Sequence, residues 1–176
     1  MKMDKKNMFE EAYKEESDAI FRFCLIRVSS REQALDITQE TFLRFWQTLT
    51  TGKKILNNKA FLFTIARRLV IDWYRKKKSL SLEDMASEEE DFVAPDKETS
   101  EENLFVGIEG RYVLDKIKEL PSAYREPLYL RFVEDLSPPE IAKILGVSTN
   151  ATSVRINRGM VELRKIVADN NDNIKK

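Results

Sequence analysis

A stretch near the carboxyl end places amide, hydroxyl and basic side chains on one face of a predicted helix. Residues 149–163 have helical spacing, and the residues pointing outward are Asn150, Ser153, Val154, Asn157 and Arg158. Amide and guanidinium groups donate hydrogen bonds to base edges and phosphates, so this face is suited to the major groove of DNA. The alternative is an ordinary helical hairpin that packs against another part of the chain, because capped helix pairs are common.

The residues before this face complete a helix-turn-helix pattern. Ser137 can cap a first helix, two prolines occupy its first turn, and Glu140 is placed to close a capping box. Gly146 supplies the left-handed stop, and Ser148 or Thr149 caps the second helix. The inward row of that second helix is Thr152, Ile156, Met160 and Leu163.

A second candidate nucleic-acid surface lies on the predicted helix 59–77. Its inward row is Phe61 or Leu62, then Ile65, Ala66, Leu69 and Trp73. Its other side mixes aromatic, aliphatic and basic residues: Phe63, Arg67, Arg68, Val70, Ile71, Tyr74 and Arg75. Basic side chains follow a phosphate backbone and aromatic rings stack on unpaired bases, so the mixture is typical of single-strand binding. The alternative, favoured by the pattern alone, is that the aromatic residues pack against a neighbouring helix.

Composition argues against an enzyme. The 176 residues include no histidine and one cysteine, which removes histidine-based catalysis, a disulfide framework and a cysteine zinc site. Because the sequence also lacks a glycine-rich phosphate loop, we expect no catalytic residues, no metal and no cofactor. No apolar run reaches about 18 residues, so we expect a cytoplasmic protein without membrane insertion.

The charge distribution divides the chain. Residues 1–78 carry 17 basic and 10 acidic residues, whereas residues 83–102 carry ten acids and one lysine. Residues 111–168 are basic again, with ten bases and seven acids. Two basic regions joined by an acidic segment suggest a polyanionic partner that is contacted at two places.

Helical periodicity predicts an all-α fold of two small domains joined by an acidic flexible linker, the second domain containing the helix-turn-helix. The predicted limits are 1–78 for the N-terminal domain, 79–103 for the linker, 104–168 for the C-terminal domain and 169–176 for a frayed tail. In the helix 31–50, Leu35 is expected on the buried side. The opposite side exposes Asp36, Gln39, Glu40 and Arg44.

Three motifs in order resemble bacterial sigma factors of the extracytoplasmic-function (ECF) type. They are ALDITQETFLRFW, AFLFTIARRLVIDWYRKKK, and LPSAYREPLYLRFVEDLSPPEIAKILGVS followed by VRINRGMVELR. The resemblance covers about residues 7–78 and 104–167. It implies a transcription initiation factor that binds core RNA polymerase and promoter DNA, both as duplex and as melted strand. It also implies an anti-sigma factor as a partner.

The resemblance assigns a role to each surface. The helix bearing Asp36, Gln39, Glu40 and Arg44 looks like the polymerase-docking element. The helix 59–77 looks like the element that opens the minus-ten region, with these candidate contacts: Phe61, Phe63, Arg67, Arg68, Tyr74 and Arg75. Arg68 stands where the family usually has asparagine, so a phosphate contact is expected there.

By the same resemblance the helix-turn-helix reads the minus-thirty-five element. The residues expected at base edges are Ser153, Val154 and Asn157, with Thr149 and Asn150 at the start of the helix. Those expected to hold phosphates are Arg131, Arg155 and Arg158. Thr152 replaces the usual aliphatic residue, which predicts slightly looser packing of this helix.

Two other functions fit parts of the pattern. An autonomous helix-turn-helix regulator would occupy an operator as a dimer, but the chain shows no dimerisation heptad and has two unlike basic regions. A helical interaction module would bind no promoter fragment, with or without polymerase. The three motifs in order favour the sigma factor over both.

Overall fold

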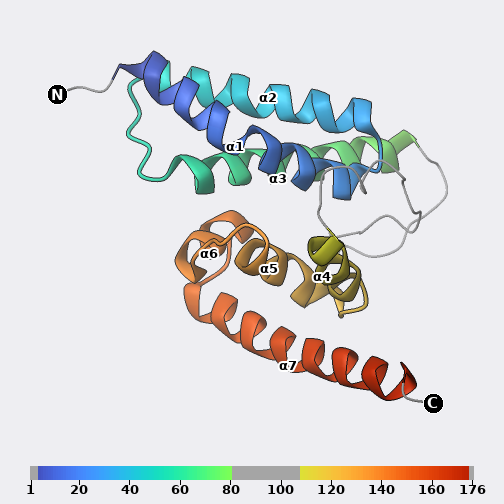
Figure 1. Cartoon of the computed structure of the whole chain (residues 1–176). Coiled ribbons are helices and arrows are strands. Elements are labelled where there is room, and N and C mark those ends of the chain that lie inside the picture. The colour runs from blue at the N-terminus through green and yellow to red at the C-terminus, as the bar shows by residue number, and fades with distance from the viewer. Residues whose placement is uncertain (1–3, 81–107, 175–176) are drawn as a thin grey trace. The chain divides into compact units, whose positions relative to one another are not determined.

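The regular elements in the described part of the chain are all helices. The computed structural model describes residues 4–80 and 108–174, and every regular element within these ranges is an α-helix (Figure 1). The chain divides into two compact units, here called the N-terminal unit (residues 4–80) and the C-terminal unit (residues 108–174). The predicted all-α class with two helical domains is confirmed. The predicted acidic linker, apart from residues 79 and 80, lies outside the described residues.

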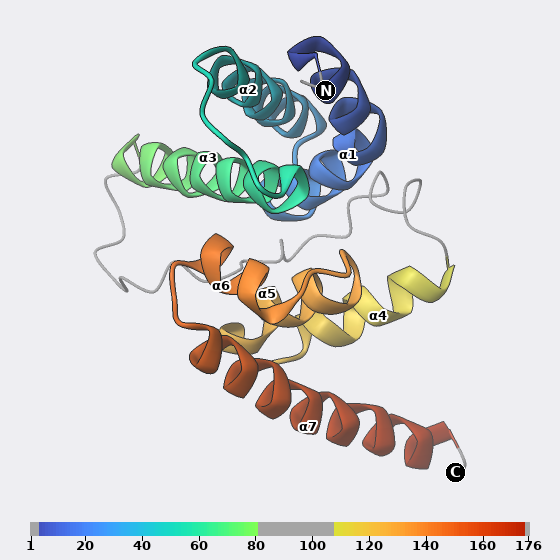
Figure 2. The ribbon, with the colours of Figure 1, turned by 90° about the vertical axis from the view of Figure 1, so that its left-hand side faces the viewer.

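The N-terminal unit is a bundle of three long helices, α1 (Lys5–Val28), α2 (Arg31–Thr50) and α3 (Asn58–Leu80). A two-residue connection joins α1 and α2 into an antiparallel hairpin, and α3 packs against both helices (Figure 2). Ser29 ends α1 with a left-handed φ of 53°, and the Ser30 hydroxyl caps α2 by accepting the Gln33 amide at 3.4 Å. The Asn57 side chain accepts the Ala60 amide at 2.8 Å and starts α3. Short polar residues therefore define the end of α1 and the starts of α2 and α3.

Aromatic residues join the three helices at one end of the bundle. Rings of α1 lie near rings of α2, with centroids 5.4 Å apart for Phe9 and Trp46 and 4.8 Å for Tyr13 and Phe42. The fully buried Phe45 ring lies 6.3 Å from the Phe61 ring at the start of α3. Fully burying a side chain such as Phe45 stabilises the fold by about 1.5–3 kcal/mol, so this cluster contributes to the stability of the bundle.

The single cysteine is a core residue, as predicted. Cys24 lies on α1 and is fully buried. Burial raises the pKa of the Cys24 thiol to about 12, against smaller opposing effects of a hydrogen bond with Thr38 and of the Arg27 charge. The thiol is therefore protonated at neutral pH and packs as a small apolar group.

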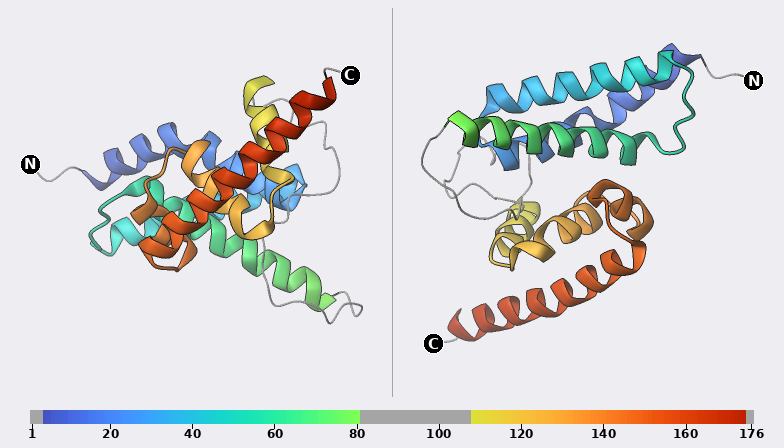
Figure 3. Two further views of the ribbon diagram at one scale, coloured as in Figure 1. Left: turned by 90° about the horizontal axis from the view of Figure 1, so that it is seen from below. Right: turned by 180° about the vertical axis from the view of Figure 1, so that it is seen from behind.

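The C-terminal unit packs four helices, α4 (Ile108–Lys118), α5 (Ser122–Phe132), α6 (Pro138–Leu145) and α7 (Thr149–Ile174). The views in Figure 3 show α7 lying along α5 and α6, which supply most of its contacts. The centre of the unit is formed by fully buried side chains: Leu120, Leu128, Tyr129, Leu130 and Ile141. The Tyr129 hydroxyl donates to the buried Glu134 carboxylate at 2.8 Å, which fixes the turn that follows α5.

Helices α6 and α7 form the predicted helix-turn-helix. The Glu140 carboxylate accepts the Ser137 amide at 2.7 Å and the Ser137 hydroxyl at 2.5 Å. Gly146 has a φ of 69° and ends α6. The Ser148 hydroxyl accepts the Ala151 amide at 3.1 Å, so Ser148 caps the second helix. These contacts fix the entry and exit of the turn.

A glycine sets how closely α7 approaches α5. A Cβ atom at Gly159 would lie 2.9 Å from both Leu128 Cδ1 and Tyr124 Cβ. No side chain larger than a hydrogen therefore fits between the helices without a shift. Sequence periodicity did not single out this position, because glycine carries no apolar side chain to mark a buried row.

Two helices extend beyond the predicted boundaries. Helix α3 continues to Leu80, two residues past the predicted end of the N-terminal domain, and α7 continues to Ile174 through most of the predicted frayed tail. Neither extension contains proline or glycine, so an existing helix can propagate by one hydrogen bond per residue. The limits proposed for the domains stay predictions. Among the described helices, none is long and apolar enough to cross a membrane.

Candidate functional sites

The outward face of α7 carries the polar residues that the sequence placed there. Asn150, Asn157 and Arg158 are exposed, and Val154 retains 38% of its surface. Each helical residue turns by about 100°, so these side chains occupy one continuous strip opposite the buried Thr152. The strip combines two amides, a guanidinium and an aliphatic group, which suits it to reading base edges and holding phosphates.

The other predicted residues of α7 lie at the margins of this strip. Thr149 is exposed at the first turn, and its carbonyl accepts the Ser153 hydroxyl at 3.0 Å. Ser153 and Arg155 are both half-buried. Ser153 therefore has its hydroxyl proton engaged within the helix and presents an acceptor oxygen outward.

Arg131, the predicted phosphate contact on α5, is held by the turn that leads into α6. Its Nη1 donates to the Leu136 carbonyl at 3.2 Å and lies 3.6 Å from Asp135 Oδ1. The Arg131 side chain is 39% exposed, so the guanidinium is positioned yet remains accessible.

Phe63 was predicted to face unpaired bases, and the structure shows that this was wrong. The side chain is fully buried, and its ring meets the Phe23 ring of α1 edge-to-face with centroids 5.1 Å apart. Val70, which the sequence placed on the same side of α3, is buried as well. The reason is that α1 and α2 both pack on α3, so the helix buries two faces rather than one.

Tyr74 is tied to the bundle through its hydroxyl. The half-buried phenol donates to the Arg27 carbonyl at the end of α1. Burial raises the pKa of the Tyr74 hydroxyl, against a smaller opposing effect of the Arg27 charge. The neighbouring Trp73 donates its indole N–H to Gln33 Oε1 at 2.9 Å. These two contacts anchor the second half of α3 to both other helices.

Basic side chains lie along the surface of α3. Arg68 and Arg75 are exposed and Arg67 is half-buried, as is Phe61 at the first turn. The exposed run continues through residues 76–78, where Lys77 Nζ lies 5.1 Å from the centre of the Trp73 ring. The structure thus places the Arg68 and Arg75 side chains at the surface of α3, with the half-buried Phe61 at its first turn.

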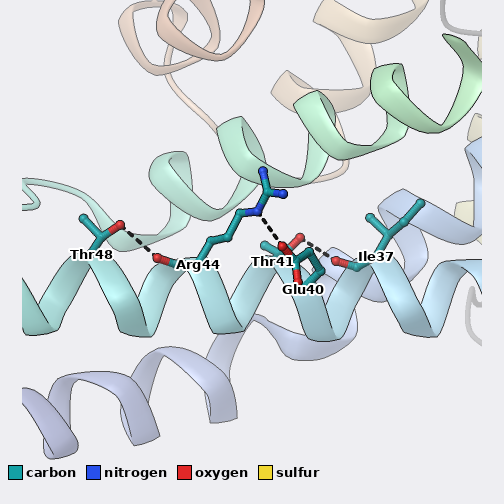
Figure 4. A network of polar contacts seen from close by, with 5 residues as sticks. All are labelled: Ile37, Glu40, Thr41, Arg44 and Thr48. Carbon is teal, nitrogen blue, oxygen red and sulfur yellow. Dashed lines mark hydrogen bonds and ion pairs between the residues drawn. The ribbon is translucent and has the colours of Figure 1, made fainter. Parts of the chain in front are cut away.

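The outer face of α2 presents the predicted docking residues. Asp36 and Gln39 are exposed, and Arg44 Nε donates to Glu40 Oε1 at 2.7 Å (Figure 4). Figure 4 also shows the Thr41 and Thr48 hydroxyls, each donating to a carbonyl one turn back. The Glu40–Arg44 pair is partly exposed and fixes both side chains along the helix.

The sequence analysis did not predict that two leucines are exposed on this face. Leu35, which was expected to be buried, retains 40% of its surface, and Leu43 retains 50%. Together with Gln39 they form a row at every fourth residue, bordered by Asp36 and Glu40. Exposed leucines beside carboxylates suit a protein-binding surface that has apolar area at its centre and charge at its rim. The signal available in the sequence was a second row of leucines, Leu35 and Leu43, on a helix that already had one apolar row to bury.

The chain matches two described protein regions. Residues 12–80 match the description "Sigma-70 region 2", and residues 110–163 match "Sigma-70, region 4". These ranges contain α3 and the outer face of α2 in the first case, and the helix-turn-helix in the second.

Relatives from Bacillus subtilis extend the similarity across most of the chain. The ECF RNA polymerase sigma factor SigW is 30% identical over 164 residues, which is 86% of this chain and 84% of SigW. The RNA polymerase sigma factor YlaC is 25% identical over 163 residues, 93% of this chain and 94% of YlaC.

Two solved structures share the fold. The sigma factor RpoE from Bartonella quintana, solved in complex with the anti-sigma factor NepR, gives a TM-score of 0.65 at 21% identity. The match covers 92% of this chain and 97% of RpoE. CnrH, solved with the cytosolic domain of CnrY, gives a TM-score of 0.59 at 20% identity over 93% of this chain and 90% of CnrH.

The two helical units and their matches show that this chain is a sigma-70-type sigma factor. Sigma factors are not enzymes in the usual sense. Within that class, the chain belongs to the ECF family of RNA polymerase sigma factors.

Proposed function

We propose that three surfaces of this chain have separate roles in promoter recognition. The chain directs promoter-specific transcription initiation through RNA polymerase. The outer face of α2 docks on core polymerase, α3 engages the minus-ten region and α7 reads the minus-thirty-five element. The observation that carries the proposal is the exposed strip on α7, where Asn150, Val154, Asn157 and Arg158 face outward from a capped helix-turn-helix. We also propose that the protein acts in the cytoplasm with the polymerase.

Docking through α2 is supported by its exposed row of Leu35, Gln39 and Leu43 beside carboxylates. Apolar side chains supply the area that is buried on binding, and the acidic border steers a basic partner into register. Leu43→Ser should weaken co-elution with core polymerase. Leu56→Ser is the matched control, because Leu56 is 79% exposed and lies outside α2. Equal loss of binding in both variants would contradict docking through α2.

Engagement of the minus-ten region by α3 is supported by its exposed cations. Arg68 and Arg75 are placed to hold phosphates, with Arg67 beside them, and Phe61 is the aromatic residue proposed to meet an unpaired base. Tyr74 supports this surface by anchoring α3 to Arg27.

Readout by α7 divides between base and phosphate contacts. We assign Asn157 to a base edge, Val154 to a thymine methyl group, and Arg158 to a phosphate. Thr149, Asn150 and Ser153 border the same readout strip, while Arg131 and Arg155 hold further phosphates. Asn157→Ala should change preference at one base pair by about 1–3 kcal/mol, whereas Arg158→Ala should weaken all promoters and lower the salt slope by about one. The same response of both variants across a promoter series would contradict this assignment.

An anti-sigma factor is proposed as the regulatory partner. RpoE and CnrH share this fold, and each was solved with a binding protein, NepR described as an anti-sigma factor in the first case and the cytosolic domain of CnrY in the second. We propose that a protein of this kind covers the outer face of α2 and so prevents docking on polymerase.

The first experiment is co-elution of the purified chain with bacterial core polymerase, followed by transcription from a promoter library. Promoter-selective transcripts are the expected result, and the enriched sequences would identify the two promoter elements. Binding of duplex DNA without any affinity for polymerase would instead indicate an autonomous regulator, an alternative that the two matched sigma regions do not favour.

A further inference from the structure

The turn between α5 and α6 carries an acidic residue at a place proposed to face DNA. Asp135 adopts a left-handed conformation, with a φ of 53°, and its side chain is 97% exposed. The following residue closes the turn, since the Leu136 amide donates to the Leu130 carbonyl at 3.0 Å. The backbone requires a residue that tolerates positive φ, and glycine or asparagine would meet that requirement without a charge.

The Asp135 carboxylate pairs with Arg131, the cation that is proposed to contact DNA. Asp135 Oδ1 lies 3.6 Å from Arg131 Nη1, and the same nitrogen donates to the Leu136 carbonyl. One side of the guanidinium is therefore directed at the turn. A phosphate approaching Arg131 meets a cation that is partly neutralised, and it also meets a nearby negative charge.

We propose that Asp135 limits the affinity of this sigma factor for promoter DNA by opposing the phosphate held at Arg131. The inference rests on the proposed phosphate contact of Arg131. Fewer counterions are released when a cation is already paired, so Asp135 also reduces the salt dependence of binding. Arg131 thus still contacts the duplex, but it contributes less to the binding free energy.

The stability of the turn does not depend on this carboxylate. The buried support of the turn is the hydrogen bond between Tyr129 and Glu134, on the inner side of the chain. An exposed ion pair such as Arg131–Asp135 contributes little to folding. Asp135→Asn and Asp135→Gly therefore remove the charge while leaving the fold and the left-handed conformation in place.

The test uses holoenzyme assembled from the full chain and core polymerase, with a fluorescent duplex that contains the minus-thirty-five element. We expect Asp135→Asn and Asp135→Gly each to tighten binding about two- to fivefold, the range that an exposed ion pair is worth, and to steepen the salt slope. In an Arg131→Ala background the same changes should have a clearly smaller effect, because only the direct repulsion between Asp135 and the phosphate is left. Asp115→Asn is the matched control, because Asp115 is an exposed acid paired with Lys118 at 3.5 Å in the same unit. It should leave binding unchanged.

The outcomes separate this inference from the proposed function. Unchanged affinity of both Asp135 variants would overturn the inference, as would equal tightening in the Arg131→Ala background or in Asp115→Asn. If Arg131→Ala alone left affinity and salt slope unchanged, the phosphate contact itself would be wrong, and the inference would fail with it.

Discussion

Helices α3 and α7 both carry mixed basic and apolar residues, yet they use them in opposite ways. On α7 the polar strip is exposed and the inward row is narrow, because the helix packs on its neighbours along one side. On α3 two apolar residues outside the first inward row, Phe63 and Val70, are also buried, because two long helices cover it. Apolar residues on two faces of a helix thus indicate two neighbours. They indicate a ligand surface only where one face is left uncovered.

Replacing the two phenylalanines of α3 gives the sharpest test of this contrast. Phe63→Ala should destabilise the N-terminal unit by about 3–5 kcal/mol, because it empties a fully buried site against Phe23. Denaturant unfolding followed by tryptophan fluorescence measures this unit alone, since both tryptophans, Trp46 and Trp73, lie in it. The half-buried Phe61 is the control, and Phe61→Ala should cost less stability but impair promoter opening. A stable Phe63→Ala variant that failed only in promoter opening would restore the stacking role.

The close approach of α7 to α5 gives the next largest effect. Gly159→Ala should destabilise the C-terminal unit by about 1–3 kcal/mol through overpacking against Leu128 and Tyr124. The sign is informative, because glycine-to-alanine at an open helical position stabilises by up to about 1 kcal/mol. Hydrogen exchange of α7 amides measures the change, with the exposed Val161→Ala as control. Stronger protection in Gly159→Ala would contradict the prediction, because it would show that α5 and α7 can shift to accommodate the added methyl group.

A smaller effect is expected from the phenol that anchors α3. Tyr74→Phe removes the hydrogen bond to the Arg27 carbonyl and should cost about 1 kcal/mol of stability. The ring remains, so promoter opening by the folded variant should be retained. Tryptophan fluorescence measures the first quantity and abortive transcription the second. Unchanged stability together with lost opening would move Tyr74 from the bundle to the DNA surface.

The smallest effect concerns the buried threonine of the recognition helix. Thr152 is fully buried, and its hydroxyl donates to the Ser148 carbonyl at 3.1 Å. That carbonyl already accepts the Thr152 amide at 3.0 Å, so Thr152→Val leaves no acceptor unpaired. We expect a stability within about 0.5 kcal/mol of the parent, or higher, by thermal unfolding. A loss of more than about 1 kcal/mol would assign the hydroxyl a larger role than a second bond to the same oxygen.

Local rules accounted for much of the C-terminal unit. Ser137, Glu140 and Gly146 act over three or four residues, so their caps could be recognised in the sequence and were confirmed. The outward position of Asn157 followed from the helical periodicity of α7, which is also a local property. Gly159 escaped prediction, because its significance depends on Leu128 of another helix, 31 positions earlier in the chain.

The N-terminal unit was harder to predict for the same physical reason. Phe63 and Leu35 each lie at a position whose burial depends on how many helices surround it, and periodicity reports the number of apolar faces without their neighbours. The packing of α1 on α3 buried Phe63, while Leu35 stayed exposed on the outer side of α2.

The sequence by itself determined the helices, the caps that begin and end them, the charge of each region and the motifs that identify an ECF sigma factor. These properties depend on interactions between residues a few positions apart, or on composition. Only the tertiary structure decided which aromatic residues of α3 are core, which leucines of α2 are exposed, and that Gly159 lies against Leu128 of α5. Burial and pairing depend on which surfaces meet in space, and the spacing of residues along one helix does not specify its neighbours.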